Sequence, residues 1–261
     1  MKTPPIFLEP PEFRVGLRPI ALADWLRVGA DPAWRAWKTA LIAAHPALVT
    51  AAAPGAEAGA LELAALLGAA SLLEAAGAVP DDLCVLERRE EGWMLAAAVV
   101  CAPTFWSLPE VIGKPLAFLH APVPDVLGRG GAQGLAARIA RVFDALAPDA
   151  PLERFNWTVQ AGDDRFTPSS APLLARAART QPAAAADVLH LRVERQTVRK
   201  LPGAGAVAFT IGVSIELLAP LLRNGETRAA FAQAWRTAPA RVRAYKNWDK
   251  LDRLVEAVLT G

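Results

Sequence analysis

The chain has 261 residues, a mass of 27.7 kDa and a formal net charge of +2. This length can bury a sizeable core, and a charge so near zero gives no reason to expect a nucleic-acid partner. Two cysteines, Cys84 and Cys101, are too few for the four thiolates of an iron–sulfur cluster. The longest apolar run, residues 63–73, is shorter than the roughly 20 residues of a membrane-spanning helix. Without a recognisable secretory leader, we expect a cytoplasmic protein and no membrane partner.

Apolar residues at helical spacing predict an N-terminal helical layer over about 20–78. Its first part covers residues 21–52, and its second is an alanine- and leucine-rich helix over 56–76. Two β-rich stretches, 83–87 and 93–101, then flank a charged turn and predict a hairpin.

A proline-rich loop over 102–124 follows, and it is too long to be a plain connection in a compact domain. Residues 133–146 have the apolar stripe of an amphipathic helix, and 181–186 form an alanine-rich linker. The end of the chain, 215–259, is predicted to be helical with interruptions at its prolines and glycines. Helices, hairpin, loop, helix, hairpin and helices make an α+β order, so we expect an antiparallel sheet.

The second hairpin is unusual because its first strand, residues 189–198, mixes charged and apolar side chains. On a period of two, Arg195 shares a face with Leu191 and Val193, whereas Arg192 and Glu194 share the other face. A guanidinium in an apolar register needs an anionic or carbonyl partner, because its desolvation is otherwise costly. We therefore expect Arg195 to be buried and paired.

Two sequence blocks resemble the haem-dependent oxidative N-demethylase family. One is Ile-Gly-Lys-Pro-Leu at 112–116 followed by Leu-His-Ala-Pro-Val-Pro at 119–124, and the other is Glu-Arg-Gln-Thr at 194–197. Further landmarks, at 16–19, 24–26, 156–157 and 245–246, extend the resemblance over nearly the whole chain. The resemblance implies one domain over 1–261, with a PAS-like antiparallel core at about 80–215 and helical additions at about 20–78 and 215–261.

The three histidines differ in their surroundings. His45 precedes a proline at a predicted helix end, where an exposed cap residue is the simplest interpretation, and His190 lies on a strand, where an ordinary polar contact suffices. His120 lies between apolar residues and the stiffening Pro122 and Pro124. The residues alone leave open whether His120 is a core histidine or a ligand. The resemblance implies that it is the axial ligand of a haem b iron.

Haem brings two propionates, and the resemblance implies that the basic and amide side chains of the two blocks hold the cofactor. Arg195 is the leading candidate. The alternative is a solvated strand edge on which Glu194 neutralises an arginine. The other residues expected to bind the cofactor are Arg192, Gln196 and Lys114.

Trp106 and Trp157 are candidates to line a pocket for an amine, because a cation is attracted to an aromatic face; the alternative is that both are core residues. Glu194 is the candidate catalytic residue, and it either holds a substrate ammonium or orients Arg195. The family's usual basic residue after Phe-Thr-Ile is replaced here by Gly212, Val213 and Ser214, and its Phe-Pro-Ser-x-Trp reads Ala-Pro-Thr-Phe-Trp at 102–106. These departures concern the substrate site more than the haem site.

The resemblance implies oxidative N-demethylation of a small methylated amine by dioxygen at a reduced haem, with release of formaldehyde. Because the chain has neither a nicotinamide fingerprint nor iron–sulfur cysteines, it implies an external flavin or iron–sulfur reductase. A non-enzymatic haem-binding sensor or carrier, and an interaction domain without a cofactor, are the alternatives.

Overall fold

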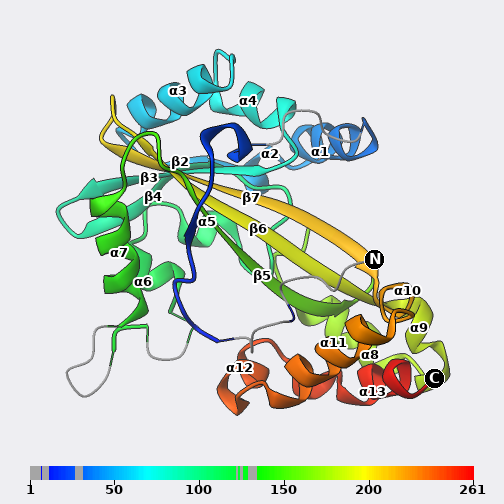
Figure 1. Ribbon diagram of the computed structural model, residues 1–261. Helices are drawn as coiled ribbons and strands as arrows, with labels where there is room; N and C mark the ends of the chain where they lie inside the picture. Colours follow the sequence, from blue (N-terminus) through cyan, green and yellow to red (C-terminus); the bar gives the residue numbers. More distant parts are fainter. Residues whose placement is uncertain (1–6, 8–11, 27–31, 122, 124–125, 129–133) are drawn as a thin grey trace.

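The computed structural model describes residues 7, 12–26, 32–121, 123, 126–128 and 134–261. In these residues the fold is α+β, and its centre is one antiparallel sheet of seven strands in the order β1-β5-β6-β7-β3-β4-β2 (Figure 1). The strands are β1 (Arg18–Pro19), β2 (Thr50–Ala52), β3 (Asp82–Arg89), β4 (Gly92–Val99), β5 (Leu152–Ala161), β6 (Leu189–Leu201) and β7 (Ala206–Leu217). The α+β class and the antiparallel sheet predicted from the element order are confirmed.

The hairpin of β6 and β7 is the middle of the sheet, and its two long strands run across the whole molecule (Figure 1). Both predicted hairpins are present, and β3 joins the second one by pairing with β7. The turn after β6 is held by Glu62, whose carboxylate accepts from the N–H groups of Gly203 at 3.0 Å and Ala204 at 2.6 Å. On its other side β6 pairs with β5, a strand that the sequence analysis did not predict.

Helices at one end of the sheet form the predicted N-terminal layer, with two differences. The helix expected over 56–76 is two helices, because Gly68 adopts a left-handed φ of 71° and Ser71 caps the second helix by accepting from the Glu74 N–H at 3.2 Å. The helical stretch expected over 21–52 ends in β2, which pairs with β4. The helices are α1 (Pro32–Ala44), α2 (Pro46–Val49), α3 (Glu57–Leu66) and α4 (Leu72–Ala78).

The remaining helices lie in two groups (Figure 1). The proline-rich segment contains α5 (Leu108–Val111) and α6 (Leu116–Leu119), and α7 (Leu135–Ala145) follows as predicted. The C-terminal group packs at the far end of the β6–β7 hairpin: α8 (Ala171–Arg179), α9 (Ala185–Val188), α10 (Leu218–Leu221), α11 (Gly225–Thr237), α12 (Ala240–Tyr245) and α13 (Asp252–Thr260). Among the described residues, none of the helices combines the length and apolar character that crossing a bilayer requires.

The two faces of the sheet have different coverings. Residues paired across antiparallel strands share a face, so the pairing of β5 with β6 and of β6 with β7 assigns each side chain. We call one side the site face; it carries Arg154, Asn156, Arg192, Glu194, Gln196 and Phe209, and α5, α6 and α7 pack on it. The other side, the Arg195 face, carries Glu153, Trp157, Val193, Arg195 and Thr197, and it packs against the N-terminal and C-terminal helices.

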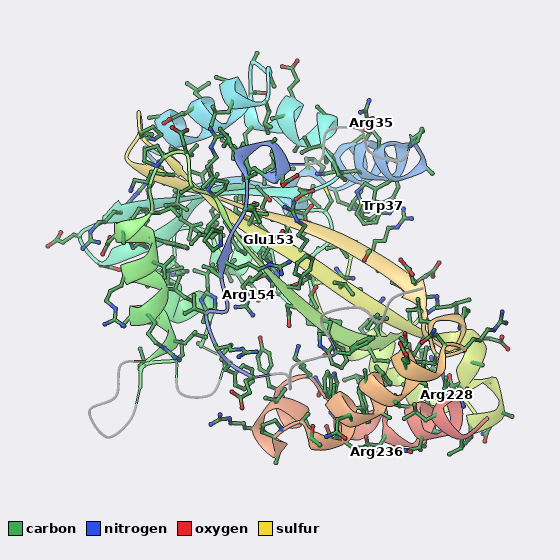
Figure 2. All side chains as sticks on the ribbon, in the orientation of Figure 1. Arg35, Trp37, Glu153, Arg154, Arg228 and Arg236 are labelled. Atoms are coloured by element: carbon green, nitrogen blue, oxygen red, sulfur yellow. The ribbon has the colours of Figure 1, made fainter. Side chains whose placement is uncertain are left out.

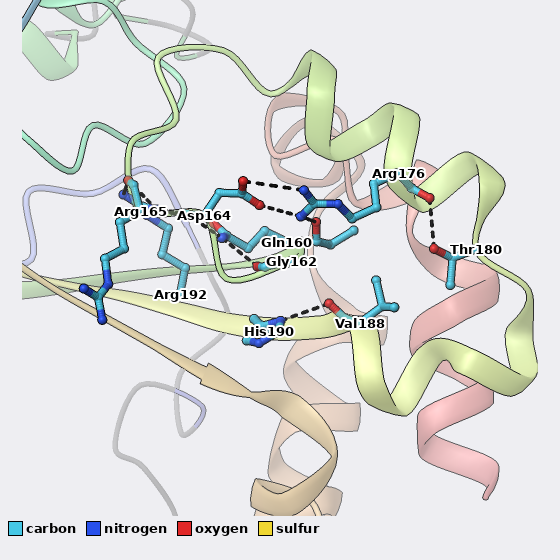
Figure 3. A network of polar contacts seen from close by, with 10 residues as sticks. Gln160, Gly162, Asp164, Arg165, Arg176, Thr180, Val188, His190 and Arg192 are labelled. Atoms are coloured by element: carbon cyan, nitrogen blue, oxygen red, sulfur yellow. Dashed lines mark hydrogen bonds and ion pairs between the residues drawn. The ribbon is translucent and has the colours of Figure 1, made fainter. Parts of the chain in front are cut away.

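Arg192 fixes the chain that crosses the site face. Its side chain is completely buried, and its guanidinium donates to the carbonyl oxygens of Ala102 at 2.7 Å and of Pro103 at 3.2 Å. It also reaches the carbonyls of Asp164 and Arg165 in the turn after β5, both at 3.3 Å (Figure 3). One buried cation therefore holds the start of the 102–124 segment and the end of β5 at fixed positions.

Replacing Arg192 with Met should lower the free energy of unfolding by at least about 3 kcal/mol, because several buried carbonyls lose a charged donor. Urea unfolding of the two proteins measures this difference. Arg199→Met is the matched control on the same strand: Arg199 is half-buried and its guanidinium lies 4.5 Å from the centre of the Trp25 ring, so its loss should cost less than about 1 kcal/mol. Equal losses in the two variants would contradict the role given to Arg192.

Candidate functional site

His120 is placed by the way its segment is attached to β4. The Gly113 N–H donates to the Leu95 carbonyl at 2.8 Å, and the Leu95 N–H donates to the Lys114 carbonyl at 3.1 Å. Gly113 has φ 71°, a left-handed conformation that favours glycine, so the chain can turn there into α6. Leu116 then packs on the site face, and His120 is the residue that caps the C-terminal end of α6. Pro122 and Pro124, predicted to stiffen this segment, lie outside the described residues.

The His120 ring is held in one tautomer. Its Nδ1 lies 2.8 Å from the carbonyl oxygen of Leu116, and a carbonyl oxygen only accepts, so Nδ1 carries the proton. Burial lowers the pKa of His120 below its usual 6.5, against the Leu116 hydrogen bond, which raises it, and with Arg154, which lowers it further. The neutral imidazole therefore presents an unprotonated Nε2, which is the form that ligates a metal.

Glu194 is the centre of a polar cluster on the same face. Its side chain is buried, and its carboxylate accepts from the Thr104 hydroxyl, from Asn156 Nδ2 at 3.1 Å and from Gln196 Nε2 at 2.6 Å. Thr104 in turn accepts from Arg192 Nε at 2.8 Å, so the Arg192 carbonyl clamp also positions a donor to Glu194. These three donors are neutral, and the carboxylate has no direct ion pair among the described residues.

The charge of Arg154 interacts with both His120 and Glu194. The sequence analysis did not identify this residue. Burial lowers the pKa of Arg154, and the nearby Glu194 carboxylate opposes that change. The same guanidinium also lowers the pKa values of His120 and Lys246. Its Nη1 donates to the Arg14 carbonyl at 3.2 Å, and within the described ranges its other two nitrogens have no hydrogen-bond partner. Arg154 follows Glu153 on β5, the strand between β1 and β6 (Figure 2).

Three further predicted residues lie on or near this face. Gln196 is half-buried and bonds Glu194. Trp106 is half-buried and packs in the apolar cluster that also contains Phe209 and Leu119. Leu119 directly precedes His120 in the chain. Lys114 is exposed, and its ammonium lies 5.6 Å from the centre of the Phe118 ring.

Arg195, Arg192 and Trp157 each contact other parts of the chain in the structure. Arg195 is paired as expected, but on the face away from His120: Nε donates to Glu153 at 2.7 Å, Nη1 to the Trp25 carbonyl at 3.0 Å and Nη2 to the Asp24 carbonyl at 2.6 Å. All three of its nitrogens are used. Trp157 is also on that face and packs against the aromatic rings of the C-terminal cluster, Phe231 and Trp248 among them.

Arg192 lies on the site face, yet its guanidinium is fully occupied by the carbonyl groups described above. The alternation within β6 was predicted correctly, but the partner of each arginine comes from distant segments that the alternation does not reveal. The other histidines lie apart from His120: His45 is exposed at the start of α2, and His190 Nδ1 contacts the Val188 carbonyl at 2.9 Å (Figure 3).

These groups define an α+β protein that carries, on one face of its sheet, a histidine in the metal-ligating form, a buried carboxylate and a half-buried arginine with two nitrogens unpaired among the described residues. The family model for haem-dependent oxidative N-demethylase, alpha subunit-like proteins matches residues 69–256. That range is more than half of the chain, so the chain belongs to this family. The resemblance seen in the sequence is thereby confirmed, and the family description indicates dependence on haem.

Arg195→Met should lower the free energy of unfolding by about 3 kcal/mol, because it leaves the buried Glu153 with only the exposed Arg18 as a cationic partner. Burial raises the pKa of Glu153, but hydrogen bonds from Arg195 and Arg18 outweigh it and hold that pKa below 4.5. The stabilisation is therefore present above pH 4.5 and is lost as the pH falls through the lowered pKa.

Urea titrations of Arg195→Met and the wild type at several pH values check this, and the difference should shrink below pH 4.5. Arg18→Met, at the exposed end of the same carboxylate, should have the smaller effect. Unchanged stability in Arg195→Met together with loss of haem would instead support the propionate role.

Proposed function

We propose that this chain binds haem b on the site face and oxidatively removes a methyl group from a small methylated amine. The observation that carries the proposal is the neutral His120, whose Nδ1 donates to the Leu116 carbonyl and whose Nε2 has no hydrogen-bond partner among the described residues, so that it can ligate iron. Haem when bound would supply dioxygen activation for hydroxylation of the N-methyl carbon. A PAS-like sheet with helical additions at both ends, forming one domain, is part of the same proposal.

Arg154 is the better candidate for a haem propionate than Arg195. It lies on the face of His120, and two of its nitrogens have no bond to another described residue, whereas every nitrogen of Arg195 is engaged. An arginine with spare donors in a partly buried setting suits a carboxylate, because its planar fork makes paired hydrogen bonds. Lys114 and Gln196 remain candidates at the margin of the same site.

Glu194 would hold the substrate ammonium, with Trp106 as an aromatic wall. Three hydrogen-bond donors support a carboxylate anion without neutralising it by a direct ion pair, so a negative charge is left for a cationic amine. Once the methyl carbon is hydroxylated, its C–N bond breaks and formaldehyde leaves with the demethylated amine as the second product. The electrons would come from an external flavin or iron–sulfur reductase, since the two buried cysteines cannot ligate a cluster.

One observation favours the second candidate, a haem-binding sensor or carrier without enzymatic activity. The Glu194 carboxylate already accepts three hydrogen bonds, so a substrate ammonium must add to them or displace one. In a sensor, Glu194 and its three donors would stabilise the sheet beneath the cofactor and would bind no amine. Formaldehyde release separates the two functions.

His120→Ala should abolish or strongly shift the Soret absorption band of haem-supplied protein, because the axial imidazole is lost. His45→Ala and His190→Ala are the matched controls, and both should keep the wild-type spectrum. Absorption spectra at equal protein concentration, with circular dichroism to confirm folding, provide the measurement. A wild-type spectrum in His120→Ala would reject this ligand.

Glu194→Gln should raise the KM for a methylated amine about tenfold or more while leaving the haem content unchanged, because the ammonium loses a buried counter-charge. The measurement is formaldehyde released from a panel of secondary and tertiary methylamines with a surrogate reductant. Glu216→Gln, an exposed carboxylate on β7, is the control. Haem-loaded wild-type protein that converts none of the amines would favour the sensor or carrier.

A further inference from the structure

Lys246 connects the C-terminal helices to the centre of the site face. It follows α12 directly, and its ammonium donates to the backbone carbonyl of Trp157 at 2.6 Å and to Asn156 Oδ1 at 2.8 Å. The first bond attaches the C-terminal helices to β5. The second bond reaches a side chain that itself contacts Glu194, so Lys246 is one residue removed from the carboxylate proposed to bind the amine.

The contacts with Lys246 and Glu194 together determine which way the Asn156 amide points. An ammonium only donates, so it must meet Oδ1, and the other end of the amide, Nδ2, is then directed at Glu194 at 3.1 Å. If the amide were reversed, its oxygen would face the Glu194 carboxylate, and two acceptors would repel each other. A neutral or apolar residue at position 246 removes one of the two groups that select this orientation and leaves Asn156 Oδ1 without its charged donor.

We infer that Lys246 is a positioning residue for the substrate amine, acting on Glu194 through the orientation of the Asn156 amide. The inference rests on the proposed function, because it assigns Glu194 to the ammonium. It extends that function by making amine binding depend on the C-terminal helical part, which contributes no direct contact to Glu194 among the described residues.

Two residues with a left-handed backbone line the same cavity as Lys246, and they support a functional role for this region. Within the described residues, Phe105 with φ 64° and Asn247 with φ 55° are the non-glycine residues with positive φ. Both line one narrow cavity together with Gln160 and Lys246. Such conformations cost energy and cluster at functional sites. Asn247 is the residue that turns the chain immediately after Lys246, so the strained position belongs to the segment that delivers the ammonium.

The charge of Lys246 gives the arrangement a pH dependence. Burial lowers the pKa of Lys246 to about 8, Glu194 on β6 opposes this, and Arg154 on β5 adds to it; Tyr245 is the titratable neighbour on the same helix. Below pH 8 the ammonium makes a charged hydrogen bond to Asn156, and above it the neutral amine makes a weaker one. Amine binding should therefore weaken as the pH rises through about 8.

The orientation can be followed without turnover, by NMR of the Asn156 side-chain amide, assigned from its absence in Asn156→Asp. In the wild type the two Nδ2 protons should be protected from exchange and should shift with a midpoint near pH 8. In Lys246→Met they should lose both protection and titration. Lys246→Arg should retain protection without the titration, because a guanidinium stays charged in this range. Lys250→Met, an exposed lysine in the next turn, is the control and should change nothing.

A double-mutant cycle on the haem-loaded protein tests the effect on the amine. Lys246→Met should raise the KM about five- to tenfold and change kcat less than about twofold, as expected for one lost orienting bond. In the Asn156→Ala background the same substitution should have almost no further effect on KM. Haem content, read from the Soret band, should be the same in all four proteins.

The outcomes distinguish a failure of the proposed amine demethylation from a failure of the positioning role of Lys246. If the wild type neither binds nor converts any methylated amine, the proposed function fails and the role of Lys246 falls with it. If amines are converted but the Lys246→Met and Asn156→Ala effects add, or the Asn156 amide ignores Lys246→Met, the positioning role alone is overturned. A Lys246→Arg variant that behaves as Lys246→Met at every pH would likewise overturn it.

Discussion

The buried guanidinium of Arg192 is the constraint around which the site face is organised. A cation without access to water must be surrounded by acceptors, and here backbone carbonyl groups from two separate segments supply them. Asp82 complements the clamp by accepting from the Cys101 and Ala102 N–H groups, both at 2.8 Å. The chain entering the 102–124 segment is thus held through its N–H groups by a buried anion and through its carbonyls by a buried cation, which leaves Thr104 directed at Glu194.

Arg195 and Arg154 lie on opposite faces of the sheet and differ in how completely their guanidinium groups are hydrogen-bonded. On one side Arg195 is saturated by Glu153 and two carbonyls. On the other side two nitrogens of Arg154 have no partner in the part of the chain that the structure describes, and its charge lowers the pKa of His120. The neighbours in sequence, Glu153 and Arg154, therefore belong to different environments because successive side chains of a strand point to opposite faces. The electrostatic coupling of Arg154 with His120 and Glu194 makes the site face one connected charge system.

The sequence predicted what depends on local pattern. Alternation in β6 gave the strand and the pairing of Arg195 with an acceptor, and the apolar surroundings of His120 agree with its lowered pKa. What the sequence did not predict depends on contacts between distant segments. Residues 155–161 of β5 do alternate apolar and polar side chains, so the local signal for this strand was present in the sequence and was not used. The partners of Arg154, Trp157 and Lys246, in contrast, come from segments distant in sequence.

The same limit applies to the partner of Arg195. Its register correctly required an acceptor, but the identity of that acceptor, Glu153, is fixed only by the pairing of β5 with β6. The broken helix after Leu66 has a local reason that the sequence did contain, namely Gly68 followed by the capping Ser71. The alanine- and leucine-rich composition of residues 56–76 by itself favours one continuous helix.

The residues that precede the matched range 69–256 satisfy charges buried within it. Lys38 of α1 lies 3.9 Å from the Asp82 carboxylate, with both side chains almost fully buried, and Asp24 and Trp25 supply the carbonyls that occupy Arg195. A fragment cut at the family boundary would thus leave an anion and a cation in the protein interior without these partners. We therefore expect a fragment that begins at residue 69 to be less stable than one that also includes the segment around Asp24 and α1.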